Sequence, residues 1–233
     1  MVPITFKVYG KYALFSDPIT RVGGEKSSYP VPTYEALKGI VSSIYWKPTL
    51  IWFIDKVRIM KPIHTVSKGI RTLMYSNNKK DLSCYSYLAD CEYQVQAHFE
   101  WNMNRPEFAA DRIEKKHLEI IRRMLLYGGR RDIFLGTREC QAYVEPCEFG
   151  FGPGPYDGLD EFPFGVMLHG FTYADEAYSE ETRNKLTVRF WNPVMRHGVI
   201  DFIRPDQCSP RMCKFVRSME IKRFPDKSDK GVV

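Results

Sequence analysis

Residues 92–102 carry the strongest secondary-structure signal in the chain, because apolar and polar side chains alternate at every position. The odd-numbered positions are apolar: Tyr93, Val95, Ala97, Phe99 and Trp101. The even-numbered positions between them are polar: Gln94, Gln96, His98 and Glu100. Successive side chains of a β-strand point to opposite faces of a sheet, so this period of two predicts a strand buried on one face only. His98 falls on the polar face, and we interpret it as a sheet-surface side chain rather than a catalytic one.

The strands and helices predicted before and after this strand follow one another in the order of a known fold. Strand signals also occur at 4–15, 50–63 and 138–148, and apolar residues at helical spacing occur at 34–45 and 106–127. Thr33 is a suitable N-cap for the first helix, and Gly128 is a suitable end for the second. Residues 64–90 predict an inserted hairpin. The order β-α-β-(insertion)-β-α-β predicts an α+β fold with a ferredoxin-like (RRM-like) N-terminal domain that carries a β-hairpin insertion.

The composition changes after residue 148. Residues 149–158 are rich in glycine and proline, and short strand-like runs follow at 165–173, 186–191 and 199–202. These runs predict a small antiparallel β-sheet C-terminal domain. We therefore expect an RNA-binding and catalytic domain at 1–148, a β-rich domain at 149–225, and a disordered tail at 226–233.

The charge balance indicates an acidic partner. The chain has 34 Lys and Arg residues against 28 Asp and Glu residues, a net charge of +6. No apolar run approaches the roughly 20 residues that a membrane-spanning helix needs. The first residues lack the order of a signal peptide, so we expect a cytoplasmic protein with reduced cysteines and no membrane partner.

One pair of side chains carries the strongest chemical signal. Lys116 and His117 are adjacent on the second predicted helix. A histidine that titrates near pH ~6.5 can give or take a proton during cleavage of RNA by its 2′-hydroxyl. A lysine can stabilise the charge that develops on the phosphate oxygens. In a ferredoxin-like topology the end of the first helix lies beside the start of the second, which places Tyr45 near both.

The basic residues around this pair predict a phosphate-binding surface. Two glycines followed by two arginines allow close backbone approach and bidentate phosphate contacts. The predicted RNA-binding residues are Arg112, Lys115, Arg122, Arg123, Gly128, Gly129, Arg130, Arg131 and Arg138. The sequence offers no H-x-H or H-E-x-x-H order, and we expect neither a metal site nor a cofactor.

Four other interpretations of these residues remain open. His117 can be a satisfied core histidine, and Tyr45 can be a packing residue at a helix end. The arginines after Gly128 can compensate the dipole of the helix they follow. Asp111 and Glu114 superficially resemble the carboxylates of a metal-dependent nuclease, although no second acidic cluster accompanies them.

Several longer segments resemble one protein family. They are GKYALFSDP at 10–18, GGEK at 23–26, VPTYEALKG at 31–39, IYWKP at 44–48, GGRRDIFLG at 128–136 and RECQ at 138–141. These segments are similar to CRISPR-associated proteins of the fifth Cas family, subtype I-C (Dvulg) branch, in the RAMP superfamily. The resemblance runs from about residue 4 to residue 220.

The resemblance implies a metal-independent endoribonuclease that cuts CRISPR precursor RNA at each repeat hairpin. It implies products with a 2′,3′-cyclic phosphate and a 5′-hydroxyl, and catalysis by a tyrosine at the end of the first helix with a Lys-His pair on the second. Those positions match Tyr45, Lys116 and His117. The matured RNA is expected to stay bound by its 5′ handle, and the protein to join the other subunits of the type I-C interference complex.

Two alternatives to the enzyme stay open at this point. Relatives in other subtypes are non-catalytic subunits that only hold the RNA handle. A basic surface of this kind can also bind duplex DNA without sequence specificity.

Overall fold

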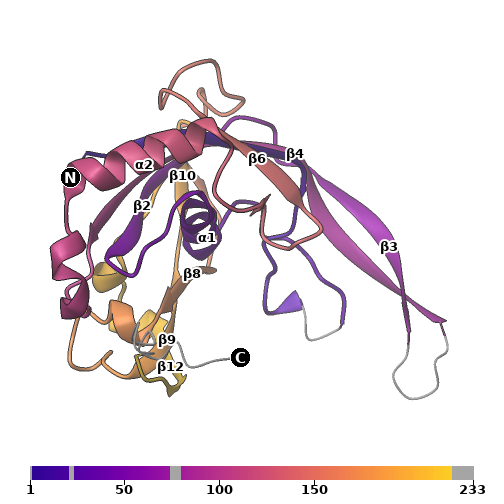
Figure 1. Ribbon diagram of the computed structural model, residues 1–233. Helices are drawn as coiled ribbons and strands as arrows, with labels where there is room; N and C mark the ends of the chain where they lie inside the picture. The colour runs from indigo at the N-terminus through magenta and orange to yellow at the C-terminus, as the bar shows by residue number, and fades with distance from the viewer. Residues whose placement is uncertain (1, 21–23, 74–79, 222–233) are drawn as a thin grey trace, which may run out of the picture.

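The computed structural model of the protein describes residues 2–20, 24–73 and 80–221. Nearly all of its strand pairs are antiparallel, and few helices accompany them, so the fold is α+β (Figure 1). Most of the strands form one extended sheet, and three others form a second sheet.

Four strands form the centre of the larger sheet. They are β1 (Ile4–Ala13), β2 (Leu50–Ile59), β4 (Lys80–Trp101) and β6 (Gln141–Pro146), in the spatial order β6-β1-β4-β2. Every neighbouring pair among them is antiparallel. Helix α1 (Tyr34–Ile44) connects β1 to β2, and helix α2 (Glu114–Leu126) lies between β4 and β6 in the chain. The short strand β5 (Ile133–Phe134) pairs with β6 at the edge.

The hydrophobic core lies between this sheet and the two helices. Val95, Ala97 and Phe99 of β4 are fully buried, as their alternation predicts. Leu37 and Val41 of α1 are buried in the same core. The side chain of Thr33 accepts a hydrogen bond from the backbone of Ala36 and caps α1 as expected. The apolar face of β4 therefore positions both helices.

The inserted hairpin is also present. Strand β3 (Thr65–Leu73) pairs with the first half of β4, from Thr65 opposite Leu88 to Leu73 opposite Lys80. Figure 1 shows this hairpin extending away from the rest of the molecule. Because β4 runs without interruption through both parts, the strand predicted at 92–102 begins much earlier than its alternation indicates.

The prediction of one continuous second helix at 106–127 is wrong over its first third. Residues Pro106–Asp111 form the 3₁₀ helix η2, and α2 begins only at Glu114. Arg112 and Ile113 leave the helical conformation between the two. The Arg112 Nη2 atom donates to the carbonyl oxygens of Asn102 and Arg105, at 3.0 and 3.2 Å, and holds the break in place.

Two predicted strands are shorter than expected. The strand expected at 50–63 ends at Ile59. The strand expected at 138–148 covers only Gln141–Pro146, because Cys140 closes a turn by donating its N–H to the Thr137 carbonyl.

The second half of the chain contributes to both sheets. Strands β8 (Met167–Thr172), β9 (Lys185–Trp191) and β12 (Cys213–Ser218) form the smaller sheet. Strands β7 (Phe162–Pro163), β10 (Val194–Arg196) and β11 (Val199–Asp201) extend the larger sheet, through the pairing of β11 with β2. Short 3₁₀ helices occur at η3 (Ala174–Glu176), η4 (Pro205–Gln207) and η5 (Pro210–Met212). The predicted division at residue 148 stays a prediction, and the tail at 226–233 lies outside the described residues.

Within the described ranges, no helix is both long and apolar enough to cross a bilayer. All six cysteines are free thiols.

Candidate active site

Tyr45 is held rigidly at the end of α1. It is the C-cap residue of the helix, and its backbone N–H donates to the Val41 carbonyl at 2.9 Å. The Trp52 indole N–H donates to the Tyr45 carbonyl at 2.8 Å, which ties the helix end to β2. Only 2% of Tyr45 is exposed, so its ring packs inside the protein.

His117 lies directly against Tyr45. Its Nδ1 atom is 2.9 Å from the Tyr45 hydroxyl oxygen, and its Nε2 atom is 2.7 Å from the backbone carbonyl oxygen of Asp111. A carbonyl can only accept, so Nε2 carries the hydrogen, and in the neutral ring Nδ1 accepts from the Tyr45 hydroxyl. The ring is 0% exposed, with the ring of Trp101 at 5.6 Å between centroids. The predicted neighbourhood of Tyr45 and His117 is therefore observed, and it lies in the core.

Lys116 is the exposed member of the predicted group. Its side chain is 47% exposed, and its Nζ atom forms an ion pair with the Asp111 carboxylate. The same carboxylate accepts a hydrogen bond from the Thr49 hydroxyl at 3.0 Å. The hydrogen bond from Lys116 lowers the pKa of Asp111, so this carboxyl is ionised at neutral pH. Lys116 and His117 thus both contact Asp111, and Tyr45 contacts His117.

The electrostatics keep the Tyr45 phenol protonated. Burial raises the pKa of Tyr45, and the negative charge of Asp111 raises it further. The positive charge of Arg130 acts in the opposite direction but does not cancel these effects. A phenol with a raised pKa donates its proton in a hydrogen bond at neutral pH, as the contact with His117 Nδ1 requires.

Residues 128–131, which we call the glycine–arginine turn, have a structural role in addition to their charge. Gly128 and Gly129 adopt φ values of +78° and +107°, and their N–H groups donate to Leu125 and Met124 carbonyls at the end of α2. The backbone N–H groups of Arg130 and Arg131 donate to the Ser43 carbonyl at the end of α1. These N–H groups are therefore used within the protein, and only the arginine side chains face outward.

The other predicted RNA-binding residues are spread over several surfaces. Lys115, Arg123, Arg130, Arg131 and Arg138 are exposed. Arg122 pairs with Glu119 at 2.9 Å and borders an apolar groove beside β1. Arg112 is half-buried and bonded to backbone carbonyls, as described above. Contact of these residues with RNA stays a prediction.

The contacts of Asp111 and Thr49 could not be predicted from the sequence. Asp111 stands out in the sequence only as a possible metal ligand, whereas its carboxylate contacts Lys116 and Thr49. Thr49 carries no motif that marks it. Across residues 2–20, 24–73 and 80–221, no cluster of three His, Cys, Asp or Glu side chains is arranged to hold a metal ion.

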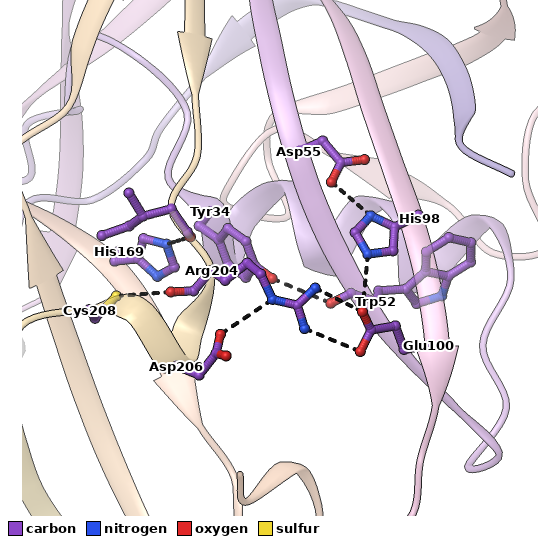
Figure 2. A network of polar contacts seen from close by, with 10 residues as sticks. Tyr34, Trp52, Asp55, His98, Glu100, His169, Arg204, Asp206 and Cys208 are labelled. Carbon is purple, nitrogen blue, oxygen red and sulfur yellow. Dashed lines mark hydrogen bonds and ion pairs between the residues drawn. The ribbon is translucent and has the colours of Figure 1, made fainter. Parts of the chain in front are cut away.

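His98 belongs to a separate polar network on the opposite face of β4. Figure 2 shows its ring between Asp55 and Glu100, with Arg204 beyond. The distance from Nδ1 to Asp55 Oδ1 is 2.7 Å, and Glu100 forms a bidentate pair with Arg204 at 2.8 and 3.2 Å. The network ties β2 and β4 to the loop before η4, and His98 lies on the polar face of the sheet as its alternation predicts.

This network predicts a pH dependence of stability. The Asp55 carboxylate raises the pKa of His98 in the folded protein. Protonated His98 therefore stabilises the fold below the unfolded-state pKa of ~6.5, and this contribution is lost as pH rises through the folded-state value. We expect the thermal unfolding midpoint to fall less between about pH 6 and 8 in His98→Gln than in wild type. His64→Gln, at an exposed histidine, is the control, and equal slopes in wild type and His98→Gln would contradict the prediction.

Comparisons with known proteins agree on one family. The family model Cas_Cas5d, described as CRISPR-associated protein (Cas_Cas5), matches residues 4–203. A relative from Mannheimia succiniciproducens, named CRISPR pre-crRNA endoribonuclease Cas5d, is 28% identical over 225 residues, 85% of this chain and 93% of its own length. A relative of the same name from Thermus thermophilus is 30% identical over 185 residues, 76% of each chain.

Two solved structures are also similar. A crystal structure of a CRISPR-associated protein has a TM-score of 0.70 at 33% identity, covering 89% of this chain and 94% of that chain. The crystal structure of a functionally uncharacterized protein from Streptococcus mutans has a TM-score of 0.69 at 36% identity, and the match covers 89% of this chain and 95% of that chain. The match of the family model over most of the chain shows that this protein belongs to the Cas5d family of CRISPR-associated proteins.

Proposed function

We propose that this protein is a metal-independent endoribonuclease that cleaves CRISPR precursor RNA at its repeat hairpins by attack of a 2′-hydroxyl. The products carry a 2′,3′-cyclic phosphate and a 5′-hydroxyl. The observation that carries the proposal is the 2.9 Å contact between the Tyr45 hydroxyl and His117 Nδ1. The Lys116 ammonium pairs with the Asp111 carboxylate, which lies 3.7 Å from the other ring nitrogen, Nε2. The names of the two relatives, both pre-crRNA endoribonucleases, support the choice of substrate.

The N-terminal half provides the ferredoxin-like framework of the proposal. The order β-α-β-β-α-β, with the spatial order β6-β1-β4-β2, supports this assignment. In this framework the end of α1 meets the start of α2, which brings Tyr45 to His117. The proposed domains are 1–148 and 149–225, with β7, β10 and β11 of the second domain added to the sheet of the first.

The proton path runs through Tyr45. As the 2′-hydroxyl gives its proton to the Tyr45 oxygen, the Tyr45 proton moves to His117 Nδ1. The 2′-oxygen then forms a bond to phosphorus, and the bond from phosphorus to the 5′-oxygen breaks. The Lys116 ammonium stabilises the phosphate oxygens and can supply the proton that the 5′-oxygen takes as it leaves.

The burial of Tyr45 sets a requirement for this mechanism. Because Tyr45 and His117 are both covered, RNA binding has to open the surface over the Tyr45 hydroxyl. Lys116 is exposed and is the first of the three groups that a phosphate would meet. After cleavage the 5′ handle stays bound, and the protein joins the type I-C interference complex.

One observation favours a second function. Both ring nitrogens of His117 are hydrogen-bonded and the ring is fully buried, as in a structural core histidine. In that case the protein is a non-catalytic subunit that binds the handle of the processed RNA.

Cleavage of the cognate repeat RNA in EDTA separates these functions. We expect the wild-type protein to cut the RNA with EDTA present and to leave a 2′,3′-cyclic phosphate. An RNA with a 2′-deoxy nucleotide at the cut site should bind but stay intact, because it lacks the nucleophile.

Four outcomes would contradict parts of the proposal. Loss of cutting in EDTA would show that a metal is required. Normal cutting of the 2′-deoxy substrate would rule out 2′-hydroxyl attack. Tight RNA binding without any cutting would favour the handle-binding subunit, and equal affinity for a duplex DNA of the same length would favour a non-specific binder.

A further inference from the structure

Asp111 contacts two of the three groups of the candidate site, through both its backbone and its side chain. Its carbonyl oxygen accepts from His117 Nε2 at 2.7 Å. Its carboxylate pairs with Lys116 and accepts from the Thr49 hydroxyl at 3.0 Å. The carboxylate oxygen Oδ2 is also 3.7 Å from His117 Nε2. One residue therefore links the loop before β2, the start of α2 and the buried histidine.

The Asp111 carbonyl decides which nitrogen of His117 carries the hydrogen. With the hydrogen on Nε2, this nitrogen donates to Asp111 and Nδ1 is free to accept from Tyr45. With the hydrogen on Nδ1, the unprotonated Nε2 would face the carbonyl oxygen, and two acceptors would oppose each other. The position of this carbonyl thus selects the tautomer that directs Nδ1 at the Tyr45 hydroxyl.

The Asp111 carboxylate keeps that carbonyl in position. Helix α2 begins without a side-chain hydrogen bond from its N-cap residue, Ile113. The segment before the helix is fixed instead by the hydrogen bond from Thr49 and the ion pair with Lys116. The Asp111 carbonyl also accepts from the Ile113 N–H at 2.8 Å, so a shift of Asp111 would move the helix start and the ring together.

The carboxylate also suits the charge that forms during a proton transfer. If Nδ1 takes the Tyr45 proton, a positive imidazolium forms in a buried site that already has the cations Lys116 and Arg130 nearby. The ionised Asp111 carboxylate, 3.7 Å from Nε2, offsets this charge. A neutral residue at position 111 would leave it uncompensated.

We propose that Asp111 is the positioning residue of this site. Its carbonyl holds His117 in the tautomer that serves Tyr45, and its carboxylate anchors that carbonyl and places Lys116 beside it. The inference rests on the proposed function for its effect on cleavage. Its effect on the histidine ring is independent of that function.

The kinetic test compares Asp111→Asn and Asp111→Ala with Glu114→Gln, which removes an exposed carboxylate from the same turn of the chain. Single-turnover cleavage and the RNA dissociation constant are measured separately. We expect Asp111→Ala to cut on the order of 10²-fold more slowly, with little change in affinity, because the reacting groups are misplaced by a small distance. Asp111→Asn should reduce the cleavage rate by a smaller factor, and Glu114→Gln should cut as fast as wild type.

The second test observes the ring itself. The ¹⁵N shifts of the imidazole, assigned with His117→Gln, distinguish a ring protonated on Nε2 from one protonated on Nδ1. We expect the Nε2–H pattern in wild type and a mixed pattern in Asp111→Ala. Thr49→Val, which removes one partner of the carboxylate and keeps its charge, should shift the pattern in the same direction by a smaller amount.

The outcomes separate this inference from the proposed function. An unchanged ring pattern in Asp111→Ala overturns the inference even if cleavage slows. An equal loss of cleavage in Glu114→Gln also overturns it, because the effect would then be one of general charge. A changed ring pattern in a protein that never cuts RNA supports the positioning role and rejects the enzyme. If Asp111→Ala does not fold, Asp111→Asn and Thr49→Val carry the same test.

Discussion

Tyr45→Phe should slow cleavage of repeat RNA by about 10²–10⁴-fold, which is the usual contribution of a positioned proton-transfer group. The substitution removes a single hydroxyl and keeps the buried ring, so the packing of Tyr45 at the end of α1 is preserved. His117 Nδ1 then has no donor in the core, and the loss of its hydrogen-bond partner should lower the free energy of unfolding by about 1–3 kcal/mol. The cleavage rate under single-turnover conditions, with a denaturation curve on the same sample, measures both effects.

Tyr127→Phe is the matched control for this experiment. Tyr127 is the C-cap residue of α2 and is exposed, so loss of its hydroxyl should change neither the rate nor the stability. Lys116→Ala provides a second comparison, because it removes the exposed cation and one partner of the Asp111 carboxylate while it leaves the Tyr45 hydroxyl in the protein. If Tyr45→Phe cut RNA as fast as wild type, the Tyr45 hydroxyl would not be on the proton path, and the proposed mechanism would be wrong.

Gly136→Ala should destabilise the protein by roughly 2–5 kcal/mol, combining backbone strain with overpacking. Gly136 has a φ of +92°, and a Cβ atom added there would lie 2.1 Å from the Leu14 carbonyl oxygen. This close approach is part of the contact between the segment after α2 and the end of β1, where the Leu14 N–H donates to the Leu135 carbonyl at 3.0 Å. Urea denaturation of both proteins would measure the difference.

Gly39→Ala is the matched control for this prediction. Gly39 lies within α1, and a Cβ atom there would meet nothing within 4 Å apart from its chain neighbours and the backbone of the helix itself. Alanine should therefore stabilise the helix, by about 0.5–1 kcal/mol. Equal midpoints for Gly136→Ala and wild type would show that the segment after α2 can move away from β1 without loss.

The order of the elements could be predicted from the sequence because the signals for strands and helices are local. The alternation at 92–102 and the helical spacing at 34–45 each depend on neighbours within a few positions. The ends of elements depended on distant partners. The helix predicted from Pro106 breaks at Arg112, whose guanidinium bonds to carbonyls of Asn102 and Arg105.

The candidate site was predictable only in part for the same reason. The residue types and the adjacency of Lys116 and His117 are properties of the sequence, and the proximity of Tyr45 followed from the topology. The use of the Arg130 and Arg131 N–H groups to cap α1 could not be predicted, because their acceptor, Ser43, lies on another helix. The hydrogen bond from Thr49 to Asp111 could not be predicted either, because the two residues lie far apart in the sequence.

The sequence by itself determined the chain order β-α-β-β-α-β, the family, and the chemical groups that could act on RNA. Only the tertiary structure decided which way His117 faces. A helical position can point at solvent or at the core, and here the rings of Tyr45 and Trp101 and the Asp111 carbonyl enclose the imidazole. Its two hydrogen-bond partners and the ring of Trp101 come from three separate parts of the fold, so its burial and its tautomer exist only once those parts have packed together.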